Sequence, residues 1–84
     1  MYFVYVLRNH HGRLYVGYTT DLERRVQQHQ LGEGGWTRVY GPWELVHYES
    51  FDDRAAAMHR ERSLKSGQGR AWLREQLNGR AGPP

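Results

Sequence analysis

The stretch "LYVGYTTDLERRVQQH", residues 14–29, joins a strand pattern to the start of an amphipathic helix. The inward positions of that helix, spaced i, i+3, i+4 and i+7, are Leu22, Arg25, Val26 and His29. Arg25 and His29 therefore share a face with core residues, whereas Arg24 turns about 100° away, toward solvent. Burying an unpaired guanidinium is costly, so a cation on the core side needs a partner or a function.

The start of this helix has its own signal. Thr20 is followed three residues later by Glu23, which is the spacing of a capping box, and this predicts Thr20 as the N-cap. A purely structural interpretation of the inward polar residues also stands. Arg25 would then extend along the edge of the apolar stripe, and His29 would be an ordinary half-buried ring.

Two strands joined by a hairpin precede the helix. "YFVYVL" (residues 2–7) and "RLYVGY" (residues 13–18) are rich in β-branched and aromatic residues. A three-residue loop of His10, His11 and Gly12 pairs positions whose numbers sum to 22. Tyr5 then lies across from Gly17, and Tyr15 projects from the same face as Tyr5. A four-residue loop would reverse that parity, and two tyrosines on one face can also serve packing alone.

The rest of the chain predicts one more strand and two helices. "WELVHYESF" (residues 43–51) is the strand, "DDRAAAMHRERSLKSG" (residues 52–67) is a helix that ends in glycine, and "GRAWLREQLNG" (residues 69–79) is a short last helix. The last helix would pack through Trp72, Leu73 and Leu77 and stop at Asn78-Gly79. We predict an α+β fold with a three-stranded antiparallel sheet flanked by helices. One domain would span residues 1–78, and residues 79–84 would form a short flexible tail.

The helix predicted for residues 52–67 also has an ionisable group on its inner stripe. The stripe passes through Ala57, Met58, Glu61, Leu64 and Lys65. Glu61 thus occupies the middle of the inward face, with a charge opposite to that of Arg25. A structural salt bridge between Arg25 and Glu61 is one explanation, and a shared functional site is the other.

Length and composition limit the function. A chain of 84 residues leaves room for a shallow site, and the absence of cysteine excludes disulfides and thiolate metal sites. The apolar run at the start is short and nothing approaches a membrane span, so we expect a soluble cytoplasmic protein with no membrane partner.

Residues 1–53 hold five arginines against seven acids, a net −2, whereas residues 54–84 hold six arginines and one lysine against two acids, a net +5. The basic C-terminal third indicates a polyanionic partner, although solvated helix faces would give the same composition.

The combined motifs resemble the GIY-YIG nuclease domain. "FVY" at residues 3–5 corresponds to the first signature triplet, and "YVG" at residues 15–17 corresponds to the second. The likeness continues through "DLERRVQQH", with an arginine and a histidine, and through "RERSLK", with a glutamate. It covers nearly the whole chain and is closest to small stand-alone members that contain little beyond the nuclease domain.

The resemblance implies roles for single residues around one site on the sheet. Tyr15 would be the general base or would orient the attacking water, and Tyr5 would position the scissile phosphate or a metal-bound water. Arg25 would stabilise charge on that phosphate, and His29 would lie near the nucleophile. Glu61 would be the single protein ligand of Mg²⁺ or Mn²⁺, an arrangement that suits Mg²⁺ because this ion keeps several waters. Gly17 would allow close approach of backbone and phosphate.

The resemblance therefore implies a metal-dependent endonuclease that hydrolyses phosphodiester bonds in DNA, with structure-specific cleavage in repair or recombination as one setting. Targeting of the protein to its DNA substrate would come from the basic C-terminal third, from a partner protein or from substrate shape. A nucleic-acid-binding module with a degenerate site is the first alternative, and a protein-interaction domain is the second. Candidate substrate contacts are the stacking groups Tyr18 and Trp36 and the cations Arg54, Arg62, Lys65, Arg70 and Arg74.

Overall fold

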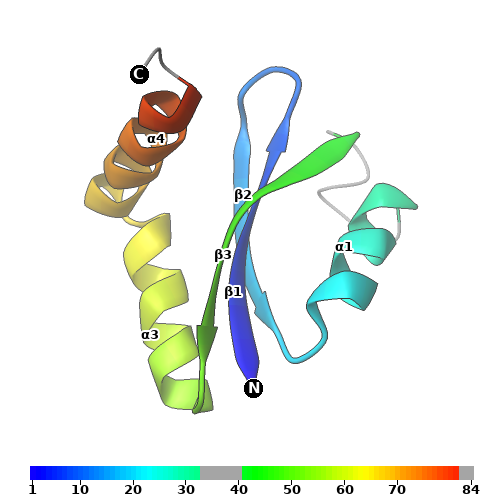
Figure 1. Cartoon of the computed structure of the whole chain (residues 1–84), viewed down its shortest axis with the longest axis vertical. Coiled ribbons are helices and arrows are strands. Elements are labelled where there is room, and N and C mark those ends of the chain that lie inside the picture. The colour runs from blue at the N-terminus through cyan, green and yellow to red at the C-terminus, as the bar shows by residue number, and fades with distance from the viewer. Residues whose placement is uncertain (33–40, 82–84) are drawn as a thin grey trace.

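The computed structural model describes residues 1–32 and 41–81 and has an α+β architecture, as the sequence predicted. Three antiparallel strands form one sheet in the order β2-β1-β3, with β1 in the centre (Figure 1). In the described parts of the chain, no helix combines the length and apolar character needed to cross a bilayer. The elements are β1 (Tyr2–Asn9), β2 (Leu14–Thr19), α1 (Leu22–Gln30), β3 (Trp43–Phe51), α3 (Arg54–Lys65) and α4 (Gly67–Ala81).

The β1-β2 hairpin has the predicted loop and register. The Asn9 amide donates to the Arg13 carbonyl at 3.1 Å, and Gly12 adopts a φ of +83°, a left-handed conformation that favours glycine. The Asn9 side chain fastens the loop, since its Oδ1 accepts hydrogen bonds from the amides of His11 and Arg13. Tyr5 pairs with Gly17, as the sum of 22 requires.

The two faces of the sheet carry different residues and different helices. Because side chains alternate along a strand, Val4 and Val6 of β1 point to one face and Tyr5 and Leu7 to the other. In Figure 1, α1 lies on one side of the sheet, and α3 and α4 lie on the opposite side. The aliphatic layer under α3 and α4 contains Val4, Val6, Leu14, Val16, Ala57, Leu64, Leu73 and Leu77. The aromatic layer under α1 contains Tyr5, Leu7 and Trp43, with Tyr15, Leu22, Val26 and Leu45 packed against them.

The first helix begins one residue later than the sequence predicted. Asp21 is the N-cap, and its Oδ1 accepts a hydrogen bond from the Arg24 amide at 3.2 Å. The predicted N-cap, Thr20, is therefore wrong. The reason lies in the turn before the helix. The Thr19 hydroxyl accepts a hydrogen bond from the Asp21 amide at 3.1 Å and fixes this turn, so that Asp21, and not Thr20, is placed to cap the first helical turn.

The second predicted helix also ends differently from the prediction. Asp53 caps α3 by accepting from the Ala56 amide, as the acidic start suggested, but the helix stops at Ser66 instead of at a glycine. Ser66 has an extended backbone, and its hydroxyl accepts from the Gly69 amide at the start of α4. One short residue thus ends one helix and caps the next.

The last helix is longer than predicted. It runs from Gly67 to Ala81, so the stop expected at Asn78-Gly79 is wrong. Asparagine and glycine each cost only about 1 kcal/mol or less in a helix, which buried Leu73 and Leu77 in the preceding turns can offset. Trp72 is 38% exposed instead of packed in the core, and it lies under the guanidinium of Arg60 at 4.8 Å from the ring centre.

Candidate functional site

The aromatic layer contains the candidate site, and its first members are the two signature tyrosines. Tyr5 on β1 and Tyr15 on β2 project from the same face, with ring centroids 6.3 Å apart. His29 reaches the same place from α1, since its ring lies 5.8 Å from Tyr5 and 4.9 Å from Tyr15 between centroids. The predicted hairpin register and helical phase together explain why these three rings meet.

A chain of hydrogen bonds orders this cluster. Arg25 donates from Nε to the hydroxyl of Tyr5 at 3.4 Å, and the same hydroxyl lies 2.9 Å from Nε2 of His29. Because a guanidinium only donates, the Tyr5 hydroxyl accepts from Arg25, and it also shares a hydrogen bond with the His29 ring. Burial lowers the pKa of His29, and the positive charge of Arg25 lowers it further, so the neutral form of the ring is favoured.

Tyr5 lies at the base of the site and away from its surface. Only 1% of the residue is exposed, and burial raises its pKa to about 12 despite the opposing hydrogen bond from Arg25. The hydroxyl of Tyr5 therefore has almost no direct access from the surface. Tyr15 is only partly buried and is the tyrosine nearer to solvent.

The glycine of the second triplet is explained by the ring of Tyr5. A Cβ added at Gly17 would lie 2.6 Å from the Tyr5 hydroxyl oxygen and 2.7 Å from Cζ, distances at which the ring would have to shift. Glycine is therefore needed at this position so that the buried ring can cross over β2. The expected approach of a phosphate to Gly17 stays a prediction.

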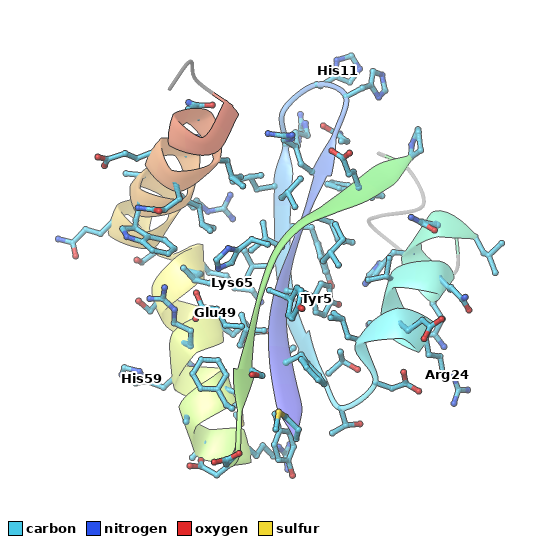
Figure 2. The ribbon with its side chains drawn as sticks, viewed as in Figure 1. Tyr5, His11, Arg24, Glu49, His59 and Lys65 are labelled. Atoms are coloured by element: carbon cyan, nitrogen blue, oxygen red, sulfur yellow. The ribbon has the colours of Figure 1, made fainter. Side chains whose placement is uncertain are left out.

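A hollow with a volume of about 300 Å³ opens beside this cluster, where β2 ends and α1 begins. Arg25 reaches it as a half-buried side chain, and its Nη1 donates to Oε1 of Gln28 at 3.1 Å. Figure 2 shows Tyr5 between the sheet and α1 and Arg24 on the outer side of that helix. The exposed Arg24 nevertheless borders the hollow, whose lining residues are Tyr18, Thr19, Thr20, Asp21, Arg24, Arg25 and Gln28.

Glu61 is the predicted site residue that the structure does not bring into this cluster. It lies on α3, the helix on the opposite face of the sheet, and it pairs with Lys65 at 3.4 Å. The alternative of a salt bridge between Arg25 and Glu61 is therefore wrong. Within residues 1–32 and 41–81, no group of three His, Cys, Asp or Glu side chains is placed to hold a metal ion.

The orientation of Glu61 on α3 follows from its neighbour. Arg60 reaches toward β3, where its Nε donates to Oε1 of Glu49 at 2.8 Å. Glu61 is about 100° further around the helix, on the other side of the buried line through Ala57 and Leu64. Its carboxylate, with 17% of the side chain exposed, therefore leans away from β3 and toward the side of β2, the other edge strand.

The predicted basic contacts lie on α3 and α4. Arg54, Arg62, Lys65 and Arg74 are exposed and Arg70 is partly buried. Arg54 connects these helices to the hollow, because its Nη2 donates to the hydroxyl of Tyr18 at 3.4 Å. The ion pair with Glu61 reduces the charge that Lys65 offers to a phosphate. Trp36, a predicted stacking group, lies outside the described residues.

Two arrangements near the sheet were missed by sequence reasoning. Gln28 is three residues after Arg25, a spacing that places both on one helix face, and this signal could have identified it. The second arrangement joins β3 to the helices of the aliphatic layer. Glu49 accepts from Arg60 and lies 2.8 Å from Nε2 of His47, and Figure 2 shows it between β3 and α3. No spacing rule predicts this contact, because it depends on how α3 packs on the sheet.

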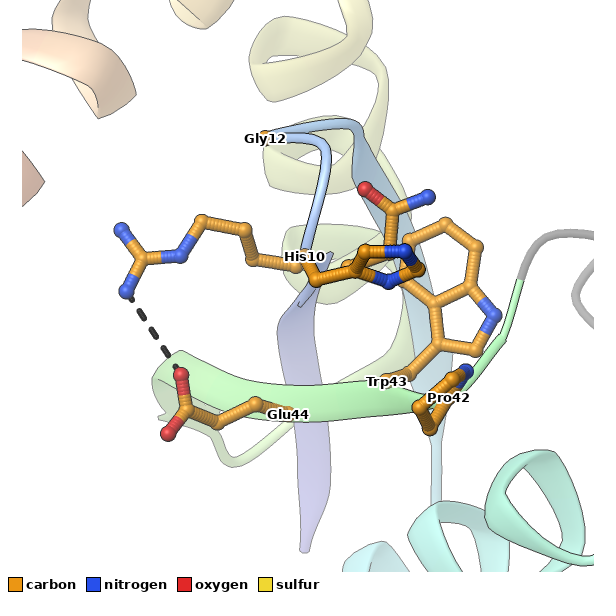
Figure 3. Close-up of a pocket in the computed structure, with 7 residues that line it drawn as sticks. His10, Gly12, Pro42, Trp43 and Glu44 are labelled. Carbon is orange, nitrogen blue, oxygen red and sulfur yellow. Dashed lines mark ion pairs between the residues drawn. The ribbon is translucent and has the colours of Figure 1, made fainter.

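A second hollow, of about 550 Å³, lies at the hairpin end of the sheet (Figure 3). Arg8 and Glu44 form an ion pair at 3.5 Å across it, and buried Trp43 lines it. None of the predicted site residues that the structure describes borders this hollow. Its lining residues are Arg8, Asn9, His10, Gly12, Pro42, Trp43 and Glu44.

The tyrosine pair, the arginine and the histidine on which the resemblance rests meet in one cluster. Residues 1–75 match the family described as the GIY-YIG catalytic domain. This chain belongs to the GIY-YIG catalytic domain family. The family is a nuclease superfamily, and membership confirms the assignment drawn from the two triplets.

The GIY-YIG relatives of this chain include small proteins named UPF0213. One from Haloquadratum walsbyi is 50% identical over 66 residues, which cover 77% of this chain and 74% of that protein. One from Natronomonas pharaonis is 53% identical over 66 residues, covering 77% of this chain and 78% of the relative. The solution NMR structure of a UPF0213 protein from Bacillus halodurans matches with a TM-score of 0.53 and 38% identity, covering 100% of this chain and 89% of that one. These names give a family and no specific activity.

Proposed function

We propose that this GIY-YIG domain is a divalent-metal-dependent endonuclease that hydrolyses phosphodiester bonds in DNA. The observation that carries the proposal is the placement of Arg25. Its guanidinium is anchored to Tyr5 and Gln28 and borders an open hollow at the end of β2. A fixed cation at a hollow suits a phosphate, because phosphodiester hydrolysis adds negative charge to the phosphate in the transition state.

The remaining cluster residues would support that cation and the attacking water. Tyr15 is the more accessible tyrosine and is the candidate to orient the water or to accept its proton. Tyr5 and His29 would act through Arg25 and Tyr15, because both are almost fully buried. In this assignment Tyr5 positions the guanidinium and does not hold the phosphate itself.

Glu61 is the candidate metal ligand. A single carboxylate fits Mg²⁺ or Mn²⁺, since Mg²⁺ keeps several waters and is bound through one or two carboxylates together with substrate phosphates. When bound, such an ion would neutralise charge that develops on the phosphate. Glu61 leans toward the β2 side of the sheet, and Arg25 borders the hollow where β2 ends. A DNA backbone crossing this edge would therefore meet residues from both faces.

The exposed cations on α3 and α4 would hold the DNA. Arg54 links this surface to the hollow through Tyr18. Contacts from these cations to phosphates displace condensed counterions, so affinity should fall steeply as salt is raised. Repair or recombination is the setting in which a structure-specific nuclease of this kind would act, and a partner protein would supply targeting.

A second candidate function is nucleic-acid binding without cleavage. The observation that favours it is the position of Glu61, which is ion-paired with Lys65 on the opposite face of the sheet from the tyrosines. A binding module needs the cations and the hollow but not the carboxylate. The two candidates therefore share the same surface and differ in whether a phosphodiester bond breaks.

The deciding experiment is cleavage of supercoiled plasmid and end-labelled oligonucleotides by the purified chain. We expect nicking with Mg²⁺ or Mn²⁺, no nicking with EDTA, and a collapse of the rate in Arg25→Ala. Binding of the same oligonucleotides is measured in parallel over a range of salt. Binding without cleavage in either metal would support the binding module, and salt-independent binding would contradict the nucleic-acid assignment.

A further inference from the structure

Arg25 is held by uncharged acceptors at different nitrogens of its guanidinium. Its Nε donates to the Tyr5 hydroxyl at 3.4 Å, and its Nη1 donates to Oε1 of Gln28 at 3.1 Å. Two acceptors at different nitrogens fix the orientation of a planar guanidinium more firmly than one can. The contact with Gln28 is the shorter of the two, so it carries a large share of this restraint.

The acceptor from Gln28 is uncharged, and this property distinguishes it from an ordinary salt bridge. A carboxylate at the same place would bind Arg25 more strongly, but it would also neutralise the guanidinium and repel a phosphate. A carboxamide oxygen orients the cation and leaves its charge intact. Arg25 has five N–H donors, and its bonds to Tyr5, Gln28 and Tyr15 use at most three of them, so donors are left over for a substrate oxygen.

Gln28 is also placed where its effect would reach the substrate. It is partly buried and lines the same hollow as Arg25, whereas its neighbour Gln27 is exposed. When Oε1 accepts from Arg25, the amide nitrogen of Gln28 keeps two N–H donors at the border of the hollow. Resting on the proposed function, we infer that Gln28 is a positioning residue that holds the Arg25 guanidinium in its phosphate-binding orientation without neutralising it.

The first test does not depend on activity. In the ¹⁵N-labelled full chain, the mobility and hydrogen exchange of the Arg25 Nε–H group are measured by NMR for wild type, Gln28→Ala and the matched control Gln27→Ala. We expect Gln28→Ala to raise the exchange rate of this group several-fold, because one of the bonds that orient the guanidinium is removed, and Gln27→Ala to leave it unchanged. An unchanged Arg25 signal in Gln28→Ala would overturn the inference, whether or not the wild type cleaves DNA.

The second test distinguishes the effect of Arg25 orientation from the effect of a negative charge added near the hollow. Gln28→Glu keeps an acceptor for Arg25 but adds a negative charge, and Gln27→Glu adds the same charge one position away on the exposed side. We expect Gln28→Glu to keep Arg25 ordered yet weaken oligonucleotide binding and cleavage by about tenfold or more, whereas Gln27→Glu changes either by less than about threefold. Equal effects of the two variants would show that general charge, and not the contact with Arg25, is responsible. Gln28→Ala should lower kcat more than it changes KM, since a displaced guanidinium loses transition-state contacts first.

The outcomes that would overturn this inference differ from those that would overturn the proposed function. Absence of cleavage by the wild type would contradict the endonuclease proposal, while the NMR comparison would still decide whether Gln28 orders Arg25. Cleavage at the wild-type rate by Gln28→Glu, with the fold intact by circular dichroism, would overturn the inference and leave the endonuclease proposal standing.

Discussion

The hydroxyl of Tyr5 lies 2.9 Å from Nε2 of His29, and the contact is buried between the sheet and α1. It ties the centre of the sheet to the only helix that covers this face in the described structure. The same hydroxyl accepts from Nε of Arg25 at 3.4 Å. The Tyr5 hydroxyl thus connects the Arg25 guanidinium to the His29 imidazole.

The raised pKa of Tyr5 predicts a loss of stability in alkali. Tyr5 has a pKa of about 12 in the folded protein against 10.0 for a free tyrosine, so the unfolded chain loses this proton first. The stabilisation is complete below pH 10 and is lost as the pH rises toward 12. We expect the melting-temperature advantage of wild type over Tyr5→Phe to shrink across this range, whereas Tyr48→Phe, at a 56% exposed site, should follow wild type. A constant difference between wild type and Tyr5→Phe from pH 9 to 12 would contradict the buried phenol.

Arg25 should matter for cleavage far more than Arg24. Arg25 is anchored at the hollow by Tyr5 and Gln28, whereas Arg24 is exposed on the outer side of α1. We expect Arg25→Ala to lower the cleavage rate by about 100-fold or more, which is the size of losing one transition-state donor. Arg24→Ala should lower the cleavage rate by less than about tenfold. Plasmid-nicking rates at saturating enzyme measure both, and equal losses would refute the assigned helix face.

Replacing Gly17 by alanine should destabilise the fold. The added Cβ would lie 2.6 Å from the Tyr5 hydroxyl oxygen, and the buried ring has little room to shift. We expect a loss of about 1–3 kcal/mol in unfolding free energy, measured in urea. Gly67→Ala is the control, because a Cβ there meets nothing within 4 Å. Near-wild-type stability of Gly17→Ala would show that the ring is not confined as described.

The variant Glu61→Gln distinguishes between two roles of Glu61, as a metal ligand and as a structural partner of Lys65. The ion pair with Lys65 is partly exposed, so its loss should cost less than about 1 kcal/mol of stability. If Glu61 holds the metal, cleavage should collapse while melting temperature and DNA binding stay near those of wild type. Glu75→Gln, an exposed change on α4, serves as the control. Retained cleavage in Glu61→Gln would contradict the ligand assignment.

The Glu49 carboxylate should make the fold sensitive to acid. Burial alone would raise the pKa of Glu49, but hydrogen bonds from Arg60 and His47 outweigh it and lower the pKa. The stabilisation is therefore present above the ordinary pKa near 4.5 and is lost as the pH falls through the lower folded value. At pH 7 we expect Glu49→Gln to cost about 1–2 kcal/mol, and the difference from wild type should vanish in acid. Glu44→Gln, at a 71% exposed side chain, should change little at any pH.

Local patterns predicted most of the fold and the core of the candidate site. Loop length fixed the parity that puts Tyr5 and Tyr15 on one face, and the 3.6-residue period placed Arg25 and His29 beside them. These relationships depend on a few neighbouring residues, so the sequence contains them. The Asp21 cap was missed because Thr19, Thr20 and Asp21 all have side chains that can cap a helix, and small differences in turn geometry select among them.

The position of Glu61 could not be predicted from its own helix. Periodicity shows that Glu61 is near the inward side of α3, but it does not say which face of the sheet α3 covers. That choice depends on the connection from β3 and on the packing of Leu64, Leu73 and Leu77 against the valines of the sheet. The Arg60–Glu49 contact was missed for the same reason, since it joins two elements whose relative position comes from tertiary packing.

The separation of the sheet into an aliphatic layer and an aromatic, polar layer has a consequence for how such a domain diversifies. Most of the purely apolar burial lies under α3 and α4, so substitutions among the polar groups under α1 can accumulate while the scaffold still folds. The aliphatic layer then maintains the fold, and the aromatic layer can vary in its chemistry. Descendants of a single ancestor could change or lose reactivity at this layer and still be inherited as stable, well-formed proteins.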